Sequence, residues 1–124
     1  MKRPIFLNLF KMKFPPMAIL SIMHRVSGVL LFLLLPFALY LLDCSLRTEQ
    51  SFAQLAVALA TPGIMMLLLW VLISASAFHL LAGIRHLIMD CGVGEHLNTA
   101  RRSAYLVMAL EVVVMILSGV WLWG

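Results

Sequence analysis

Two histidines and an arginine lie inside a long apolar run, and they are the residues whose type and position could do chemistry. His79, Arg85 and His86 fall within residues 64–89, a stretch long enough to cross a lipid bilayer. Ionisable side chains in such a stretch are costly and therefore indicate a role. Small residues surround His79 on a helical wheel, namely Ala75, Ser76, Ala82 and Gly83. Such a face admits either a closely packed helix or a flat macrocycle lying edge-on against it.

The two histidines differ in depth. His79 lies about 16 Å along the helix axis from Asp90, and His86 lies two turns nearer the membrane surface. A neutral imidazole in hydrocarbon needs a partner, and haem iron is one, because b-type cytochromes use histidine as an axial ligand. We therefore interpret His79 as a candidate haem ligand and His86 as a group near the edge of the cofactor. In the alternative interpretation, His79 hydrogen-bonds a neighbouring helix and its small neighbours serve packing only.

A second polar cluster lies near the start of the first apolar run. Ser21, His24, Arg25 and Gly28 are spaced at i, i+3, i+4 and i+7, so they share one helical face. Ser21 and Arg25 can both donate hydrogen bonds, which suits a carbonyl acceptor such as that of a quinone. The simpler interpretation is an anchor, with Arg25 extending to the lipid head groups.

The composition favours an integral membrane protein. The 124 residues are 64% hydrophobic and 11% charged, far from the balance of soluble domains. We predict an all-α fold with three membrane-spanning helices, at about residues 18–42, 63–89 and 103–123. Pro36 should kink the first span rather than end it. A short helix is predicted over 49–60, Thr61-Pro62 should begin the next helix, and residues 91–102 should form a loop.

The distribution of basic residues predicts the orientation. The net charge is +4, and the nine Lys and Arg lie at the ends of apolar runs rather than on one soluble face, which argues against nucleic-acid binding. The region up to Arg25 and the second loop are rich in them, so both are predicted to be cytoplasmic and the C-terminus external. The basic segment 1–17 suits the membrane surface or a partner. Cys44 and Cys91 then lie on opposite sides, and we expect no disulfide.

Two motifs carry a family resemblance. The sequence S-I-M-H-R-V-S-G at 21–28, with Arg3-Pro4 upstream, and H-L-L-A-G-I-R-H-L-I-M-D at 79–90 resemble the cytochrome b membrane-anchor subunit of bacterial succinate dehydrogenase, part of respiratory complex II. The resemblance covers essentially the whole chain. It implies a location in the bacterial inner membrane and an electron-transfer role without independent catalytic activity.

The resemblance also implies site residues and partners. His79 would be the axial ligand of haem b, with the opposite ligand from a second anchor subunit in a shared helical bundle. His24, Arg25 and His86 would lie near the haem propionates, and Ser21 and Arg25 would border the ubiquinone site. FAD and iron–sulfur clusters would belong to the flavoprotein and iron–sulfur partner subunits, since this chain has no motif for them.

Two other functions stay open on the sequence alone. One is a haem-free structural anchor that only docks soluble subunits. The other is a small transporter with His79 and Glu111 as a proton relay. Glu111 lies inside the third apolar run, lies outside both motifs, and has no functional assignment from the sequence.

Overall fold

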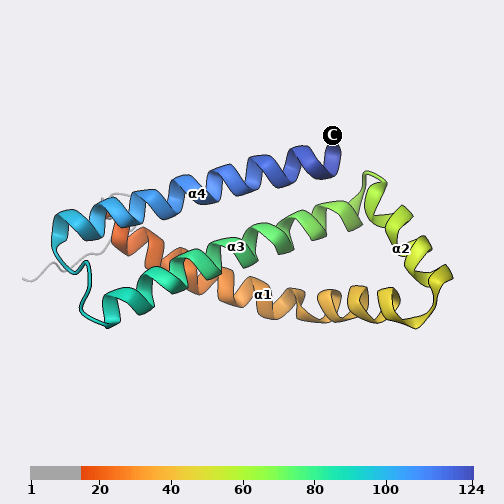
Figure 1. Ribbon diagram of the computed structural model, residues 1–124, viewed down its shortest axis with the longest axis horizontal. Coiled ribbons are helices and arrows are strands. Elements are labelled where there is room, and N and C mark those ends of the chain that lie inside the picture. Colours follow the sequence, from red (N-terminus) through yellow and green to blue (C-terminus); the bar gives the residue numbers. More distant parts are fainter. Residues whose placement is uncertain (1–14) are drawn as a thin grey trace, which may run out of the picture.

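The computed structural model describes residues 15–124, which form four helices and no strand. The helices are α1 (Pro16–Arg47), α2 (Glu49–Ala60), α3 (Ile64–Asp90) and α4 (Leu97–Trp123). In Figure 1 the three long helices run side by side, and the short α2 joins α1 to α3 at one end. The prediction for the N-terminal segment 1–17 falls mostly outside the described residues.

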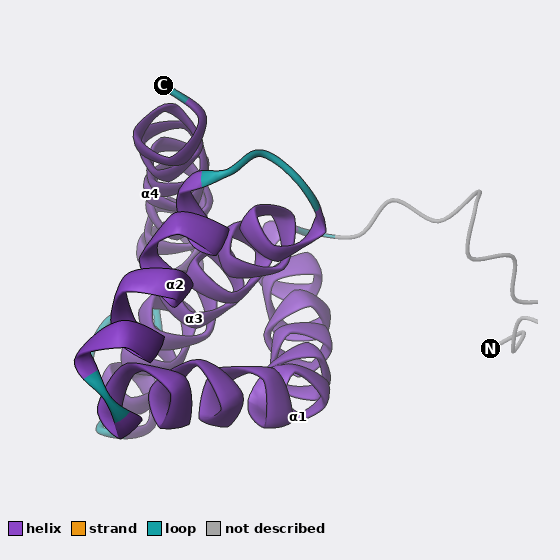
Figure 2. Cartoon of the chain, turned by 90° about the vertical axis from the view of Figure 1, so that its right-hand side faces the viewer, coloured by secondary structure: helices purple, strands orange, loops and turns teal. Residues whose placement is uncertain are grey.

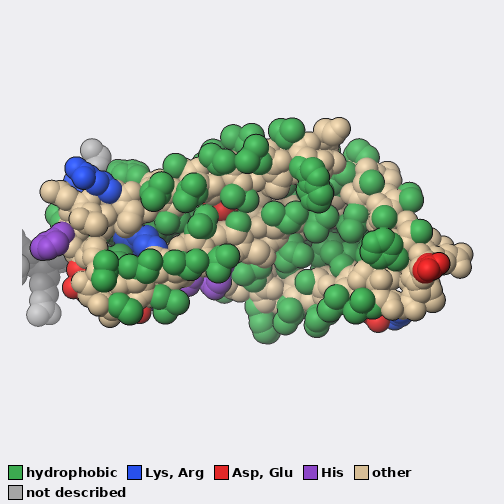
Figure 3. Space-filling model, in the orientation of Figure 1, with side chains coloured by type: hydrophobic (Ala, Val, Ile, Leu, Met, Phe, Trp, Pro, Cys, Tyr) green, Lys and Arg blue, Asp and Glu red, His purple; other side chains and the backbone are tan. Residues whose placement is uncertain are grey.

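The all-α architecture with three candidate spans is confirmed. Helices α1, α3 and α4 are each long and apolar enough to cross a membrane. Their outward surface is covered with apolar side chains, and most charged groups lie toward the ends of the molecule (Figure 3). Phe32 and Trp121, for example, are each 74% exposed within this chain. A surface of this kind is stable against lipid or another apolar helix, so the chain is a multi-pass membrane protein.

The helices pack around α3. Helix α3 makes the most extensive contacts with both α1 and α4, and Figure 2 shows α2 crossing one end of the bundle. The buried core is small and consists of Leu20, Phe78, Ala82, Ala104 and Val107. Alanines at the contacts let the helix backbones approach closely. Two members of the predicted small-residue face, Ala75 and Ala82, are buried in this packing, as the packing interpretation of that face requires.

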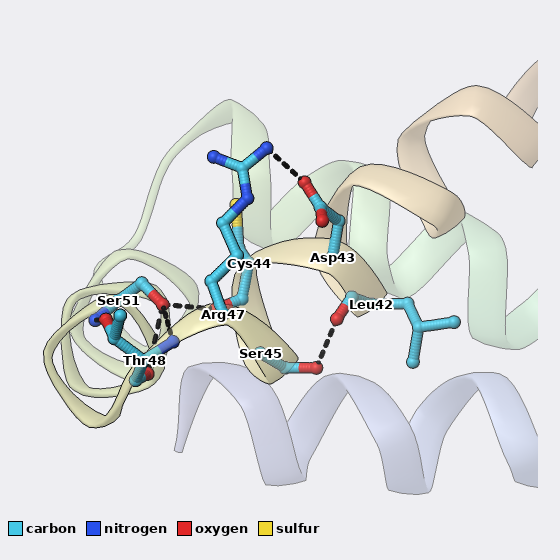
Figure 4. A network of polar contacts seen from close by, with 7 residues as sticks. All are labelled: Leu42, Asp43, Cys44, Ser45, Arg47, Thr48 and Ser51. Atoms are coloured by element: carbon cyan, nitrogen blue, oxygen red, sulfur yellow. Dashed lines mark hydrogen bonds and ion pairs between the residues drawn. The ribbon is translucent and has the colours of Figure 1, made fainter.

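The turn from α1 into α2 is held by local polar contacts (Figure 4). Helix α1 continues through Pro36 and ends at Arg47, five residues beyond the predicted span, because Asp43 and Arg47 form an i,i+4 ion pair on its last turn. The hydroxyl of Thr48 accepts from the Ser51 amide at 2.9 Å, and the Ser51 hydroxyl accepts from the Thr48 amide at 3.1 Å. This reciprocal cap begins α2 at Glu49, and the predicted helix over 49–60 is confirmed.

Two predicted helix starts are wrong. Thr61 does not cap α3: its amide and its hydroxyl both donate to the Val57 carbonyl, so Thr61 ends α2 and α3 begins at Ile64. Helix α4 begins at Leu97, so the predicted loop 91–102 is reduced to residues 91–96. Gly92 and Gly94 have φ of +84° and +74° in this loop, where a side chain would be strained.

Candidate functional site

The structure brings His24 of α1 and His79 of α3 into direct contact. Their rings stack with centroids 4.1 Å apart and planes inclined by 8°. Both residues are partly buried. The two motifs that the sequence analysis treated separately therefore meet at one point of the α1–α3 contact.

One nitrogen of His79 is held by two oxygen atoms from α1. Its Nδ1 lies 2.9 Å from the Ser27 hydroxyl oxygen and 3.3 Å from the His24 carbonyl oxygen. The Ser27 hydroxyl already donates its hydrogen to the same carbonyl, at 2.7 Å, so both neighbours of Nδ1 act as acceptors. The proton of a neutral His79 imidazole therefore belongs on Nδ1, and Nε2 carries a lone pair. No hydrogen bond within residues 15–124 uses that lone pair.

Each histidine is accommodated by a glycine on the opposite helix. A Cβ at Gly28 of α1 would lie 3.2 Å from His79 Cε1, and a Cβ at Gly83 of α3 would lie 3.4 Å from His24 Nε2. Both helices thus contain a histidine followed four residues later by a glycine, and the antiparallel crossing pairs each histidine with the other helix's glycine. The absent side chains allow the imidazoles to sit between the helices.

Two cavities flank this histidine pair. The first, about 370 Å³, is bordered by His24, His79, Gly83 and His86 and otherwise by aliphatic residues of α3. The second, about 180 Å³, is bordered by a polar set that includes most of the predicted site residues. The polar residues at this cavity are Ser21, His24, Arg25, Arg85 and His86, and all of them except Arg85 are predicted site residues. Ser21, His24, Arg25 and His86 are therefore brought together at one end of the bundle.

The two arginines at the second cavity differ in what holds them. Arg85 donates from Nε to the Ser103 hydroxyl at 2.9 Å and from a terminal nitrogen to the Ala100 carbonyl at 3.0 Å, which fastens α3 to α4. Arg25 is exposed and has no such contact with residues 15–124. His86 lies 3.6 Å from the Asp90 carboxylate on the exposed side. Arg25 is therefore the cation available to a ligand, whereas Arg85 has a structural role.

Ser27 is the residue that sequence reasoning missed. It is buried, and no helical-face argument connected it to His79, because it lies on a different helix. The signal that could have found the contact is the shared spacing of His24 to Gly28 and of His79 to Gly83. Two consecutive spans run antiparallel, and in that arrangement the spacing can pair each histidine with the other helix's glycine, which places Ser27 beside His79.

Comparison with known proteins agrees with a fold of membrane-spanning helices. Residues 1–118 match the family model described as succinate dehydrogenase/fumarate reductase transmembrane subunit. A protein of Coxiella burnetii, the succinate dehydrogenase cytochrome b556 subunit, is 48% identical over 122 residues, which cover 98% of each chain. The chain belongs to the transmembrane subunit family of succinate dehydrogenase and fumarate reductase, whose members work as part of an oxidoreductase complex and have no activity alone.

Proposed function

We propose that this chain is the haem b anchor subunit of a succinate:ubiquinone oxidoreductase and that His79 is its axial ligand to the haem iron. The histidine pair also holds part of the haem pocket, and the polar cavity beside it forms part of the ubiquinone site. Electrons reach this site from a flavoprotein and an iron–sulfur subunit. The named relative, a cytochrome b556 subunit, supports the assignment of haem b.

The observation that carries the proposal is the pair of oxygen atoms at His79 Nδ1. With Nδ1 donating to the Ser27 hydroxyl oxygen and the His24 carbonyl, Nε2 has the lone pair that a metal ligand needs. An imidazole oriented by a hydrogen bond at its other nitrogen is the usual arrangement of a metal-bound histidine. The cavity of about 370 Å³ beside His79 has mostly apolar walls, which suit a macrocycle. The residues present therefore fit the group.

The other predicted residues fit polar ends of the two ligands. Haem, when bound, supplies a centre that accepts and returns one electron. His24, Arg25 and His86 present donors at the same end of the bundle, where they would hold the propionates. Ser21 and Arg25 lie at the exposed rim of the polar cavity, where each can donate to a quinone carbonyl. Arg85 keeps α3 and α4 together under this cavity.

The rest of the site comes from partners. His79 would be this chain's ligand to the haem, and a second anchor subunit would supply the other ligand and complete the helical bundle. The exposed apolar surface of the spans is available for that contact. The proposed location is the bacterial inner membrane, with the N-terminus and the loop 91–96 on the cytoplasmic side and the C-terminus on the periplasmic side.

The test is substitution of His79 by leucine in the whole complex. The reduced-minus-oxidised absorption spectrum of the purified complex should lose its bis-histidine signature, and haem per complex should fall. His96→Leu is the matched control, because His96 precedes α4 in a loop and borders neither cavity. An unchanged spectrum and haem content in His79→Leu would contradict the ligand assignment. Complete absence of haem from the unmodified complex, with its soluble subunits still attached, would identify a haem-free structural anchor instead.

A further inference from the structure

A separate cavity lies between all three long helices, on the α4 side of the α1–α3 contact. It has a volume of about 300 Å³, within the range of small-ligand sites. Its walls are almost wholly apolar, with Val26 and Leu30 from α1, Phe78 from α3 and Met115 from α4. The cavity beside His79 contains no α4 residue, so the two open on opposite sides of the α1–α3 contact. The cavity is therefore distinct from the proposed haem and quinone sites.

Two buried polar side chains border this cavity without a partner. Ser74 of α3 and Glu111 of α4 are each 8% exposed. The Ser74 hydroxyl oxygen and Glu111 Oε2 are inaccessible and make no hydrogen bond within residues 15–124. A buried polar group left without a partner costs about 1–3 kcal/mol, and hydrocarbon offers no water to replace it.

The unmet hydrogen bonds are confined to these two residues. The other polar groups that border the cavity are used already: the Trp70 indole donates to the Met115 carbonyl at 3.0 Å, and the Ser27 hydroxyl donates to the His24 carbonyl. An apolar space with a few polar groups on its wall is the usual form of a site for a small lipophilic molecule. An occupant with an apolar body and one polar group would satisfy both sets of requirements.

We propose that this cavity binds a membrane-soluble aromatic alcohol, whose hydroxyl bonds Glu111 and Ser74 once these two side chains turn toward the cavity. A hydroxyl can donate to the carboxyl oxygen of Glu111 and at the same time accept from the hydroxyl of Ser74. A carbonyl has no hydrogen to donate to a carboxyl oxygen, and an ammonium would bring a charge into an almost wholly apolar space. The ring lies against Phe78 and the aliphatic walls, and any alkyl tail leaves toward the bilayer.

Equilibrium binding to the purified complex in lipid nanodiscs tests the proposal with a matched pair of probes. The probes are 4-octylphenol and its methyl ether, 4-octylanisole, which cannot donate a hydrogen bond. The unmodified complex should bind the phenol about tenfold more tightly than the ether, as expected when the ether leaves one buried partner unsatisfied. Equal affinity for the two probes, or no saturable binding of the phenol, would overturn the proposal.

Substitutions place the phenol in this cavity. Glu111→Met should lower the affinity for the phenol by about three- to tenfold and leave that for the ether unchanged, because only the phenol donates to Glu111. Ser74→Ala should lower the affinity for both probes by about three- to tenfold, because the oxygen of each probe accepts from Ser74. Ser118→Ala is the control, because Ser118 donates to the Met115 carbonyl but does not border the cavity. If Glu111→Met prevents assembly, Ser74→Ala decides, since it removes only one oxygen. Unchanged phenol affinity in Ser74→Ala would contradict the site.

A competition experiment identifies which kind of membrane-soluble alcohol occupies the cavity. Displacement of the phenol by a short-chain ubiquinol would assign the cavity to the quinol pool, and lack of displacement would assign it to another phenolic lipid. Neither binding measurement depends on haem or on succinate oxidation. Failure of the His79 assignment would therefore leave the preference for the phenol intact, and loss of that preference would leave the haem spectrum intact.

Discussion

Replacing Ser27 with alanine should weaken haem retention without removing the ligand. Ser27 lies 2.9 Å from His79 Nδ1 and gives its own proton to the His24 carbonyl, so it acts only as an acceptor for the imidazole. Alanine removes that acceptor and frees the carbonyl, which lies 3.3 Å from Nδ1. The imidazole then keeps its proton on Nδ1 but has one weaker partner, and its orientation is held less firmly.

The magnitude follows from what such partners contribute elsewhere. Loss of a residue that orients a metal-bound histidine lowers metal affinity by about 10–100-fold. That range equals about 1.4–2.7 kcal/mol. Because the His24 carbonyl remains as a partial substitute, we expect a loss near the lower end, about tenfold. Ser27→Ala should therefore retain haem in the freshly purified complex and release it faster to an excess of a haem-scavenging protein.

The assay measures the rate of haem release and the reduction potential of the haem that remains. Weaker hydrogen bonding at Nδ1 makes the imidazole a poorer donor to the ferric iron, so the potential should rise. Ser45→Ala is the matched control, because the Ser45 hydroxyl makes the same bond to the carbonyl three residues earlier, at 2.7 Å, but touches no histidine. Identical release rates and potentials for the two variants would refute the reasoning.

Four other substitutions test separate parts of the site. Gly28→Ala places a Cβ 3.2 Å from His79 Cε1, and that ring is already held at Nδ1, so the substitution should lower haem content and destabilise the complex by about 1–3 kcal/mol. Gly83→Ala places its Cβ at an ordinary contact distance of 3.4 Å from His24 Nε2 and should be tolerated in the same haem assay. Equal damage from both would contradict the difference expected from these two distances. Arg25→Leu should slow quinone reduction more than succinate oxidation with an artificial acceptor, whereas equal loss of both activities would indicate an assembly defect. Arg85→Leu should instead lower the temperature at which the subunits dissociate, because α3 loses its two bonds to α4, and should change the preference between the two acceptors little.

Apolar runs predicted the three spans because hydropathy reports which parts of a chain can lie in hydrocarbon. The same signal does not report where a helix begins or ends. Helix α1 passes Leu42 because a local ion pair extends it through polar residues, and it ends at Arg47, where the Thr48 cap begins α2. Helix α4 starts at Leu97, among polar residues, where Arg85 also binds the Ala100 carbonyl. These ends depend on side-chain contacts that no hydropathy pattern contains.

For the candidate site, the sequence could predict which side chains share a helical face but not the contacts between helices. The spacing of Ser21, His24 and Arg25 on one helix indicated a shared face, and the structure places them at one cavity. The contact between Ser27 and His79 depends on how α1 crosses α3, which a single-helix wheel cannot show. The sequence shows Glu111 only as an acidic residue inside an apolar run. That its carboxyl group lacks a hydrogen-bond partner, and that Ser74 of another helix borders the same cavity, depends on the packing of the helices.

The reciprocal pairing of His24 with Gly83 and of His79 with Gly28 makes the site independent of how the helices are connected. Each helix contributes one segment of five residues, and neither α2 nor the loop 91–96 takes part. A shift of one helix along the other by a single turn would separate both pairs together, so the two contacts fix the relative position of the helices along their axes. Loops of different length, or a chain broken between α1 and α3, are therefore compatible with the same arrangement of imidazoles. The depth of the site in the membrane is a property of where two helices cross.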